Sequence, residues 1–349
     1  MAMAGCSKGG SGSGELNVGF IYIGPVADGG FTLAHDNARK VVEEKLGGRG
    51  VKTHYVENVP EGAECATAIE NLIKQKNCKL IFATSFGYMD YCEQMAQKYP
   101  DVKFMHCSGY KTADNMGNYF GRMYQPRYLS GMVAGMMTKT NKIGYVAAFG
   151  IPEVVRGINA FTLGVRAVNP DATVNVVWSN TWVDPAVERQ SAQSLLDAGC
   201  DVMAQHQDTT QPVEAAEAAG AYSIAYHTTM KQVAPKGYLT GAVWDLGNYY
   251  TSVVESVLDN TFKPEVYWGS MKDGVVKLDE FGPAVTQEAK DAVAAKQKEI
   301  VDGTWDVFTG PIKDQSGNVK VADGAKMTDE ELLAFDWFVE GVVGEIPQS

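Results

Sequence analysis

Short apolar runs rich in β-branched residues alternate with amphipathic segments along most of the chain, and this alternation limits the possible folds more than any other feature. The runs have the length and composition of strands, and the segments between them are long enough for helices. The pattern therefore predicts βαβ units with a parallel sheet. In the first part of the chain we expect strands in 16–23, 52–56, 79–84, 103–107 and 119–123, and helices in 31–46, 63–76 and 88–98.

The alternation begins again near residue 142, which indicates a second unit of the same kind. Here we expect strands in 142–149, 173–178, 202–205, 222–225 and 239–243, and helices near 152–168, 185–198 and 212–219. Two doubly wound halves fit a chain of 349 residues. The remaining segments, 250–258, 286–301 and the turns of 310–324, are too small for a third domain, so we expect them to complete the two lobes.

Composition excludes several classes of partner. The formal charge is −12, from 30 basic and 42 acidic residues, and no basic stripe offers a surface for nucleic acid. No run reaches the roughly 20 apolar residues that span a bilayer. The cysteines and histidines lack metal-ligand spacing, so neither a metal nor a cofactor is expected.

The first fourteen residues differ from the rest in composition. Ala4-Gly5-Cys6 is similar to the end of a bacterial lipobox, and a Gly/Ser-rich tether follows through residue 14. We interpret Cys6 as a lipid-attachment site whose signal segment is missing from the sequence; the alternative is a cloning remnant before an ordinary disordered terminus. The other cysteines are interpreted as small buried residues, with any disulfide left open: Cys65, Cys78, Cys92, Cys107 and Cys200.

Functional residues are expected just after the strands, because ligands of open α/β sheets bind beyond the carboxyl ends of the strands. Aromatic, acidic and imidazole side chains recur at these positions in both halves. They suit a flat, neutral ligand whose faces stack on rings and whose edge forms hydrogen bonds. The candidates are Asp28, Gly30, Phe31 and Tyr88 in the first half, and Trp182, Gln207, Asp208, His227, Trp244 and Asp245 in the second.

Motifs for chemistry on the ligand are missing from the sequence. It contains neither HExxH nor GxSxG, and the phosphate-binding patterns GxGxxG and GxxxxGK[ST] do not occur. We therefore expect a binding protein and not an enzyme. Three alternatives stay open: a binding protein for a sugar or another small polar ligand, a nucleoside-cleaving enzyme using Asp28 and His206, and a cytoplasmic sensor domain.

Several segments resemble the basic membrane protein family, the substrate-binding lipoproteins of ABC importers that include purine nucleoside receptors. The resemblance extends over nearly all of 16–301. It is carried by GFIYIGPVADGGF (19–31), YLSGMVAG (128–135), GIPEVVRGIN (150–159) with Gly164, DAGCDVMAQHQ (197–207) and GVVKLDEFGP (274–283).

The resemblance implies an α/β fold of the type I periplasmic binding protein, with two Rossmann-like lobes joined by three crossovers. Lobe 1 would comprise 15–124 and about 246–270; lobe 2 would comprise 125–245 and about 271–349, including a C-terminal extension. It implies a monomer that is exported, lipid-anchored to the bacterial membrane facing the periplasm or the exterior, and delivers its ligand to an ABC permease.

The resemblance also assigns roles to individual residues. Phe31 and Trp182 would stack on a purine base from opposite lobes, and Asp28 would form hydrogen bonds with the edge of the base. Neighbouring loops would contribute Tyr88 and either Gln207 or Asp208.

Two positions depart from the nucleoside-binding members of the family. Those members use an acidic residue and a lysine to hold the ribose hydroxyls, whereas this chain has His227 and Trp244 there. The exchange removes sugar-binding groups and adds a bulky indole. We therefore expect a free purine base such as adenine as the ligand, ahead of a nucleoside.

Overall fold

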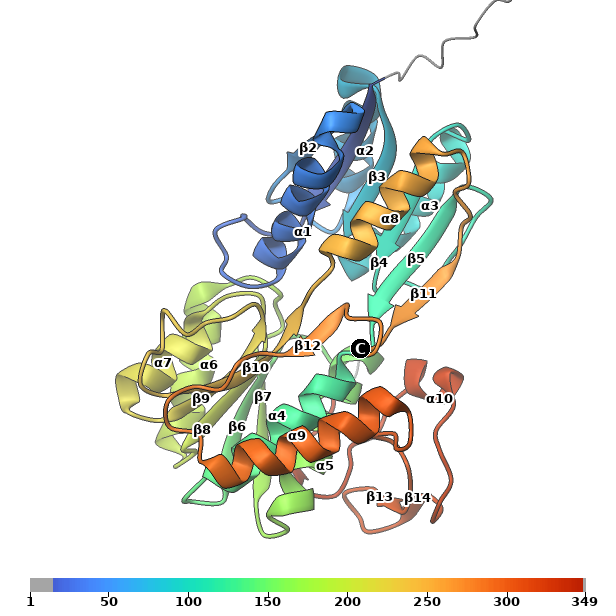
Figure 1. Ribbon diagram of the computed structural model, residues 1–349. Helices are drawn as coiled ribbons and strands as arrows, with labels where there is room; N and C mark the ends of the chain where they lie inside the picture. Colours follow the sequence, from blue (N-terminus) through green and yellow to red (C-terminus); the bar gives the residue numbers. More distant parts are fainter. Residues whose placement is uncertain (1–14, 348–349) are drawn as a thin grey trace, which may run out of the picture.

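The computed structural model describes residues 15–347 and contains two lobes, each built on a largely parallel sheet (Figure 1). The tether of residues 1–14 and Cys6 lie outside the described residues. The predicted architecture, two α/β lobes of the type I periplasmic binding protein class, is confirmed.

Lobe 1 has a six-stranded parallel sheet in the order β11-β5-β4-β3-β1-β2. Its strands are β1 (Leu16–Tyr22), β2 (Val51–Val56), β3 (Cys78–Thr84), β4 (Lys103–Cys107), β5 (Met116–Gly121) and β11 (Val266–Gly269). Its helices are α1 (Phe31–Leu46), α2 (Ala63–Lys76), α3 (Met89–Lys98) and α8 (Gly247–Leu258), with short 3₁₀ turns η1 (Gly47–Arg49) and η2 (Phe86–Tyr88).

Helices cover both faces of this sheet at β1, which explains why this strand reads as a nearly continuous apolar run. All seven residues of β1 are buried. Val18, Phe20 and Tyr22 pack in the core beneath α1 and α8, whereas Ile21 packs beneath α2 and α3 on the other face. Successive side chains of a strand point to opposite faces, so a strand between two helical layers needs apolar residues at every position.

Lobe 2 has a seven-stranded sheet in the order β12-β10-β9-β8-β6-β7-β15, parallel except for the β10–β12 pair. Its strands are β6 (Lys142–Ala147), β7 (Thr173–Trp178), β8 (Val202–His206), β9 (Tyr222–His227), β10 (Tyr238–Trp244), β12 (Val276–Leu278) and β15 (Val342–Val343). The helices are α4 (Tyr124–Met137), α5 (Pro152–Val168), α6 (Pro185–Asp197), α7 (Gln211–Ala219), α9 (Gln287–Asp302) and α10 (Asp329–Leu333), and the C-terminal segment adds the hairpin β13 (Ile312–Lys313) and β14 (Val319–Val321).

Helices α4 and α5 pack unusually closely, and this contact fixes the position of the first turn of α5 at the cleft. A Cβ atom at Gly131 would lie 2.1 Å from the carbonyl oxygen of Phe161, and one at Gly164 would lie 1.9 Å from that of Tyr128. Only glycine permits such an approach of two backbones. The contact explains the glycines of YLSGMVAG and of the segment after GIPEVVRGIN.

Three segments cross between the lobes: 122–123 after β5, 245–246 after β10, and 270–275 between β11 and β12. The strand before the first crossover begins earlier than predicted, because β5 runs over Met116–Gly121 and not 119–123. Gly117 and Asn118 hide its beginning, since both residue types are uncommon in strands. The predicted strand 142–149 is likewise shorter and ends at Ala147.

The two lobes touch each other directly across the cleft. Gly29 of lobe 1 forms an isolated β-bridge with Thr209 of lobe 2, and the Thr228 hydroxyl donates to the Gly29 carbonyl at 2.6 Å. A Cβ at Gly30 would lie 2.2 Å from the Asp208 carbonyl oxygen, so the chains approach here as closely as glycine allows. The structure therefore represents the closed form of the clamshell.

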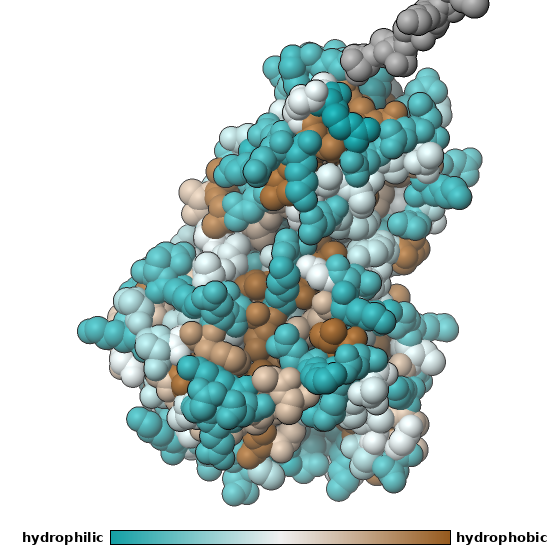
Figure 2. Space-filling view, viewed as in Figure 1, coloured by the Kyte–Doolittle hydropathy of each residue, from teal (hydrophilic) through white to brown (hydrophobic). Residues whose placement is uncertain are grey.

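The surface is mostly hydrophilic and the cysteines are buried, as is usual for folded α/β domains. Figure 2 shows hydrophilic residues over most of the viewed face, with smaller hydrophobic patches between them. The five cysteines within 15–347 are buried and unpaired, in agreement with their interpretation as small core residues. Across the same residues, no helix has the length and apolarity to cross a membrane, and no cluster of side chains could hold a metal ion.

Candidate functional site

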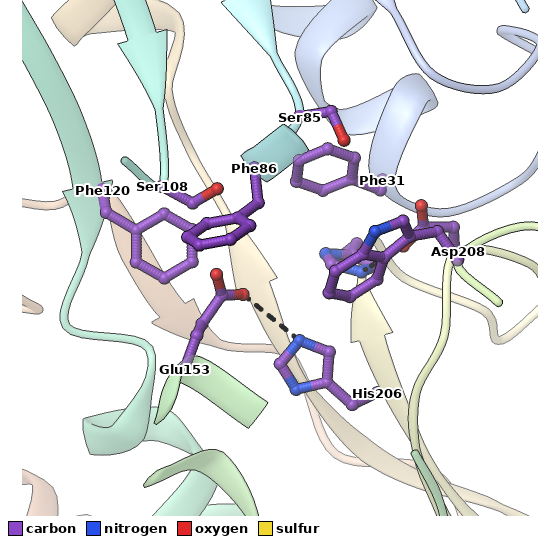
Figure 3. A pocket seen from close by; sticks show the side chains of 10 residues that line it. Phe31, Ser85, Phe86, Ser108, Phe120, Glu153, His206 and Asp208 are labelled. Atoms are coloured by element: carbon purple, nitrogen blue, oxygen red, sulfur yellow. Dashed lines mark ion pairs between the residues drawn. The ribbon is translucent and has the colours of Figure 1, made fainter. Parts of the chain in front are cut away.

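A pocket lies between the lobes at the carboxyl ends of strands from both sheets (Figure 3). It contains about 320 Å³ of space not occupied by atoms, its mouth included. Lobe 1 lines it with Phe31, Ser85, Phe86, Ser108 and Phe120, and lobe 2 with Glu153, Trp182, His206, Asp208 and His227.

The wall from lobe 1 consists mainly of aromatic rings. Phe31 is the first residue of α1, and its ring meets the imidazole of His227 edge-on, with centroids 5.0 Å apart. Phe86 begins η2, directly after β3. That loop is held in place because the Glu61 carboxylate accepts from the Ser85 hydroxyl at 2.5 Å and from the Gly87 amide at 2.8 Å.

Trp182 is the aromatic contribution of lobe 2. It lies in the loop between β7 and α6, and its indole packs edge-on against Phe149, with centroids 5.0 Å apart. The tilted imidazole of His206 lies 6.3 Å from the same ring. Rings therefore reach the pocket from both lobes, as a stacked planar ligand requires.

A buried chain of polar groups, Trp244–His227–Asp208, forms one side of the lobe 2 wall. The Trp244 indole N–H donates to His227 Nδ1 at 3.0 Å. Burial is the largest cause that holds the pKa of His227 well below 6.5, and the charge of Arg127 adds to it, so the ring is neutral and carries its proton on Nε2. This N–H lies 3.4 Å from Asp208 Oδ1 and makes no well-aligned hydrogen bond among the described residues.

Asp208 itself favours the neutral form. Burial is the largest cause, and the neighbouring carboxylates of Asp28 and Glu188 add to it; together they raise the pKa of Asp208 well above 3.8. A protonated carboxyl has one O–H donor and acceptor oxygens, so Asp208 and His227 together offer two donors and an acceptor to a ligand edge.

Glu153 and His206 form the other polar side of the pocket. Glu153 lies in the first turn of α5, and its Oε1 is 3.3 Å from Nε2 of His206, the last residue of β8 (Figure 3). Burial lowers the pKa of His206 to about 4, although the Glu153 side chain opposes that shift. The imidazole is thus neutral, and the carboxylate favours its proton on Nε2.

Four of the predicted site residues line this pocket together: Phe31, Trp182, Asp208 and His227. Trp244 lies directly behind them as the donor to His227. Gly30 lies at the contact between the lobes described above.

Asp28 has a different position from the one expected at the purine edge. Its carboxylate accepts from the backbone N–H groups of Gly30 at 2.8 Å, Thr32 at 2.7 Å and Leu33 at 3.0 Å. It therefore holds the loop before α1 and satisfies orphan donors of the first turn, as an N-terminal cap does. Burial raises the pKa of Asp28, while these hydrogen bonds oppose the shift.

Tyr88 points away from the pocket into the core of lobe 1. Its hydroxyl donates to the Val59 carbonyl at 2.5 Å, and its ring is fully buried among residues of α2 and α3. The 3₁₀ turn η2 reverses the chain after β3, so Phe86 faces the cleft and Tyr88, two residues later, faces inward. Phe86 is therefore the pocket residue of this loop.

Gln207 and Asp245 stabilise segments near the pocket and do not line it themselves. The Gln207 amide donates to the Ser179 hydroxyl at 2.6 Å and fixes the loop after β8. Asp245 lies on the second crossover and pairs with Lys277 of β12, so it links two segments near the hinge.

Six pocket residues were not predicted as ligand contacts: Ser85, Phe86, Ser108, Phe120, Glu153 and His206. Of these, His206 was named only for the alternative of a nucleoside-cleaving enzyme. The signal for five of the six is the same rule of strand ends. Ser85, Phe86 and Ser108 follow a strand within two residues, His206 ends β8, and Phe120 is the next-to-last residue of β5. Glu153 is different, because it lies six residues after β6 and reaches the cleft only through the position of α5.

Comparison with known proteins gives the family. The family model for PnrA-like ABC transporter substrate-binding proteins, named Bmp, matches residues 15–307. The chain belongs to this family. Its predicted membership is thereby confirmed, and the family model describes a substrate-binding protein of an ABC transporter.

Curated relatives of this Bmp protein cover nearly its whole length. A purine-binding protein of Brucella abortus is 42% identical over 99% of both chains. A putative ABC transporter glucose-binding protein of Haloferax volcanii is also 42% identical, over 97% of this chain and 83% of the relative. Among solved structures, a solute-binding protein of an ABC transporter from Aeropyrum pernix aligns with a TM-score of 0.73 at 17% identity, over 92% of this chain and 98% of that one.

Proposed function

We propose that this Bmp protein captures a free purine base, with adenine as its preferred ligand, and delivers it to an ABC permease. The observation that carries the proposal is the composition of the closed pocket. Rings of Phe31 and Phe86 from one lobe and of Trp182 from the other surround the buried Asp208–His227 pair.

Stacking supports a planar ligand. Each base–aromatic stack contributes about 1–3 kcal/mol when judged by alanine substitution. The pocket lies between the lobes and is walled by rings from both, which suits one flat bicyclic base.

A protonated Asp208, the form that its burial favours, would select adenine among the purines. Adenine presents an amino donor at N6 beside an acceptor at N7, and a neutral carboxyl offers the complementary acceptor and donor. Guanine presents two acceptors, O6 and N7, at the same edge. One carboxyl O–H cannot satisfy both, and an unpaired buried acceptor costs about 1–3 kcal/mol.

The position of Trp244 disfavours a ribose. Its indole is buried behind His227, and its six-membered ring fits so tightly against β5 that a Cβ at Gly121 would lie 2.5 Å from it. Nearby, His227 offers one N–H in place of the carboxylate and ammonium expected of nucleoside-binding members. The indole therefore holds in place a wall that lacks the groups for ribose hydroxyls.

A sugar is the second candidate, because one relative at 42% identity is named as a putative glucose-binding protein. Aromatic platforms beside acidic and imidazole groups also bind sugars, so the residue types alone leave it open. The purine-binding relative of equal identity, together with rings on two opposite walls, favours the base.

The setting of the binding step follows from the family. We propose that the protein works outside the cytoplasm as a monomer, held at the membrane by a lipid on Cys6, and that the residues assigned above to lobes 1 and 2 move as units about the three crossovers.

A thermal-shift and calorimetric comparison of adenine, guanine, adenosine and glucose tests the proposal, since a ligand that binds only the folded state raises the melting temperature. We expect adenine to stabilise the protein most, adenosine less, and glucose not at all. A larger shift with adenosine overturns the argument from Trp244. A shift with glucose alone replaces the purine with the sugar.

A further inference from the structure

Gly157, in the interior of α5, is not explained by packing. Glycine is less favourable than alanine inside a helix, so it usually marks a close contact. Gly131 and Gly164 meet that expectation, with carbonyl oxygens 2.1 and 1.9 Å from the site of an added Cβ. At Gly157 the nearest atom lies 3.5 Å away, an ordinary contact distance that alanine would tolerate.

Three polar atoms converge on the space that a side chain at Gly157 would fill. His206 Nδ1 lies 3.5 Å from the Cβ position, and Arg127 Nε and Tyr145 Oη each lie 3.7 Å from it. All three side chains are buried, with exposed fractions of 3%, 0% and 0%, and none of the three atoms has a hydrogen-bond partner within residues 15–347.

This space is the back of the ligand pocket. A small cavity lined by Gly157, Arg127 and Tyr226 shares Glu153, His206 and Phe120 with the pocket. Arg127 is fixed there, because Nη1 donates to the Gln205 carbonyl at 2.6 Å and the guanidinium lies over the Tyr226 ring at 3.6 Å. Its Nε lies 3.7 Å from the Cβ position and has no hydrogen-bond partner within residues 15–347.

The chemistry of the three atoms defines the guest. Arg127 can only donate, and Tyr145 can donate or accept. The neutral His206 carries its proton on Nε2, toward Glu153, so its Nδ1 can only accept. A guest must therefore accept from Arg127 and also donate to His206. Water does both, whereas an anion has no proton to give to Nδ1.

We propose that a neutral, water-sized hydrogen-bonding molecule occupies the space above Gly157 and links Arg127 and Tyr145 to His206 Nδ1. By occupying that lone pair, it keeps the imidazole proton on Nε2 and so holds the Glu153–His206 side of the pocket in one hydrogen-bonding state. Arg127, Tyr145 and Gly157 are thus positioning residues. Their effect on ligand affinity rests on the proposed function, but the guest itself does not.

Two substitutions at one position test the site in ligand-free protein. Gly157→Ala fills the space with a methyl group, and we expect the melting temperature to fall by about 2–5 °C despite the better helix propensity of alanine. Gly157→Ser places a hydroxyl near the position of the guest and should recover at least half of the loss. A higher melting temperature in Gly157→Ala than in the wild type overturns the proposal.

Nitrogen-15 spectra of the imidazole rings give a readout that simple packing would not change. The chain has only five histidines, and a His206→Gln variant assigns the relevant signals. We expect the Nε2-protonated form of His206 in the wild type, a mixture of tautomers in Gly157→Ala, and recovery in Gly157→Ser. An unchanged His206 signal in Gly157→Ala overturns the positioning role.

Crystals soaked in bromide distinguish the neutral guest from an anion. Density without anomalous signal above Gly157 supports water, and a bromide peak there overturns the neutral guest. If adenine is the ligand, Gly157→Ala should also weaken its binding by about 3- to 10-fold. The measurements of stability, the spectra and the crystal soaks need no ligand. Their outcome therefore tests the guest site independently of the purine assignment.

Discussion

The two lobes contribute unlike walls to one pocket. Lobe 1 supplies three phenylalanine rings and two serines, whereas lobe 2 supplies one indole and all four titratable side chains, two carboxyls and two imidazoles. Rings attract any flat ligand, but buried polar groups penalise a ligand that leaves them unpaired. The comparison indicates that lobe 1 provides general affinity and that lobe 2 decides which ligand is accepted.

The largest effect is expected at the polar centre of lobe 2. Asp208→Ala removes the donor and acceptor pair and should lower adenine affinity about 100-fold. Asp208→Asn should stay within about fivefold of the wild type, because an amide offers adenine a similar pair. Calorimetry at pH 7 measures both. If asparagine is as poor as alanine, Asp208 binds as an ionised carboxylate and the adenine argument fails.

The aromatic walls should contribute next, and equally from both lobes. Phe31→Ala and Trp182→Ala each remove one stacking surface, so each should weaken adenine binding about 10- to 30-fold. Tyr110→Ala is the matched control, because that ring is 67% exposed and lies outside the pocket. Equal behaviour of all three variants in titrations would contradict the stacking arrangement.

Trp244 should have a smaller effect, since it acts through His227. Trp244→Phe keeps most of the ring but removes the N–H that donates to His227 Nδ1, so the proton on Nε2 is no longer fixed. We expect a loss of about 3- to 10-fold in adenine affinity. Trp305→Phe, on a partly buried indole that packs on Tyr128 of α4, is the control. Indistinguishable affinities for the two variants would show that the indole N–H is dispensable.

The smallest effect on adenine affinity is expected at Glu188, so its role is tested through the stability of the protein. Glu188 supports the loop of lobe 2 that touches lobe 1. It accepts from the Thr209 hydroxyl at 2.5 Å, and burial raises its pKa to about 7. A folded pKa above the usual 4.5 means that its favourable contribution is complete below about pH 4.5 and is lost as pH rises through 7. Between pH 5 and 8, urea titrations should show the wild type losing about 2 kcal/mol more of its free energy of unfolding than Glu188→Gln. Parallel profiles for the two proteins would contradict the raised pKa.

The fold could be predicted from the sequence because inner strands of both sheets, such as β3 and β6, are buried on both faces and are therefore apolar over most of their length. The rule of strand ends likewise found Phe31, Trp182, Asp208 and His227, since the carboxyl ends of parallel strands meet at one edge. The direction of a side chain after a strand could not be predicted from the sequence, because it depends on the geometry of the turn. For this reason Tyr88 was predicted to line the pocket, whereas Phe86 does so.

Chemical roles were harder still to predict. A carboxylate in a loop can face a ligand or the nearest helix N-terminus. Asp28 caps α1, because three backbone N–H groups at the start of that helix lie within hydrogen-bond distance of its carboxylate. Glu153 was missed because its place depends on the packing of α5 on α4, a tertiary contact with no signal at residue 153 itself.

The bridge between Gly29 and Thr209 has a consequence for transport efficiency. These contacts between the lobes use backbone groups and one hydroxyl of the protein itself. They contribute to the stability of the closed form in addition to whatever a bound ligand contributes. Variants that weaken them should therefore shorten the lifetime of the closed form, and with it the time available for docking on the permease.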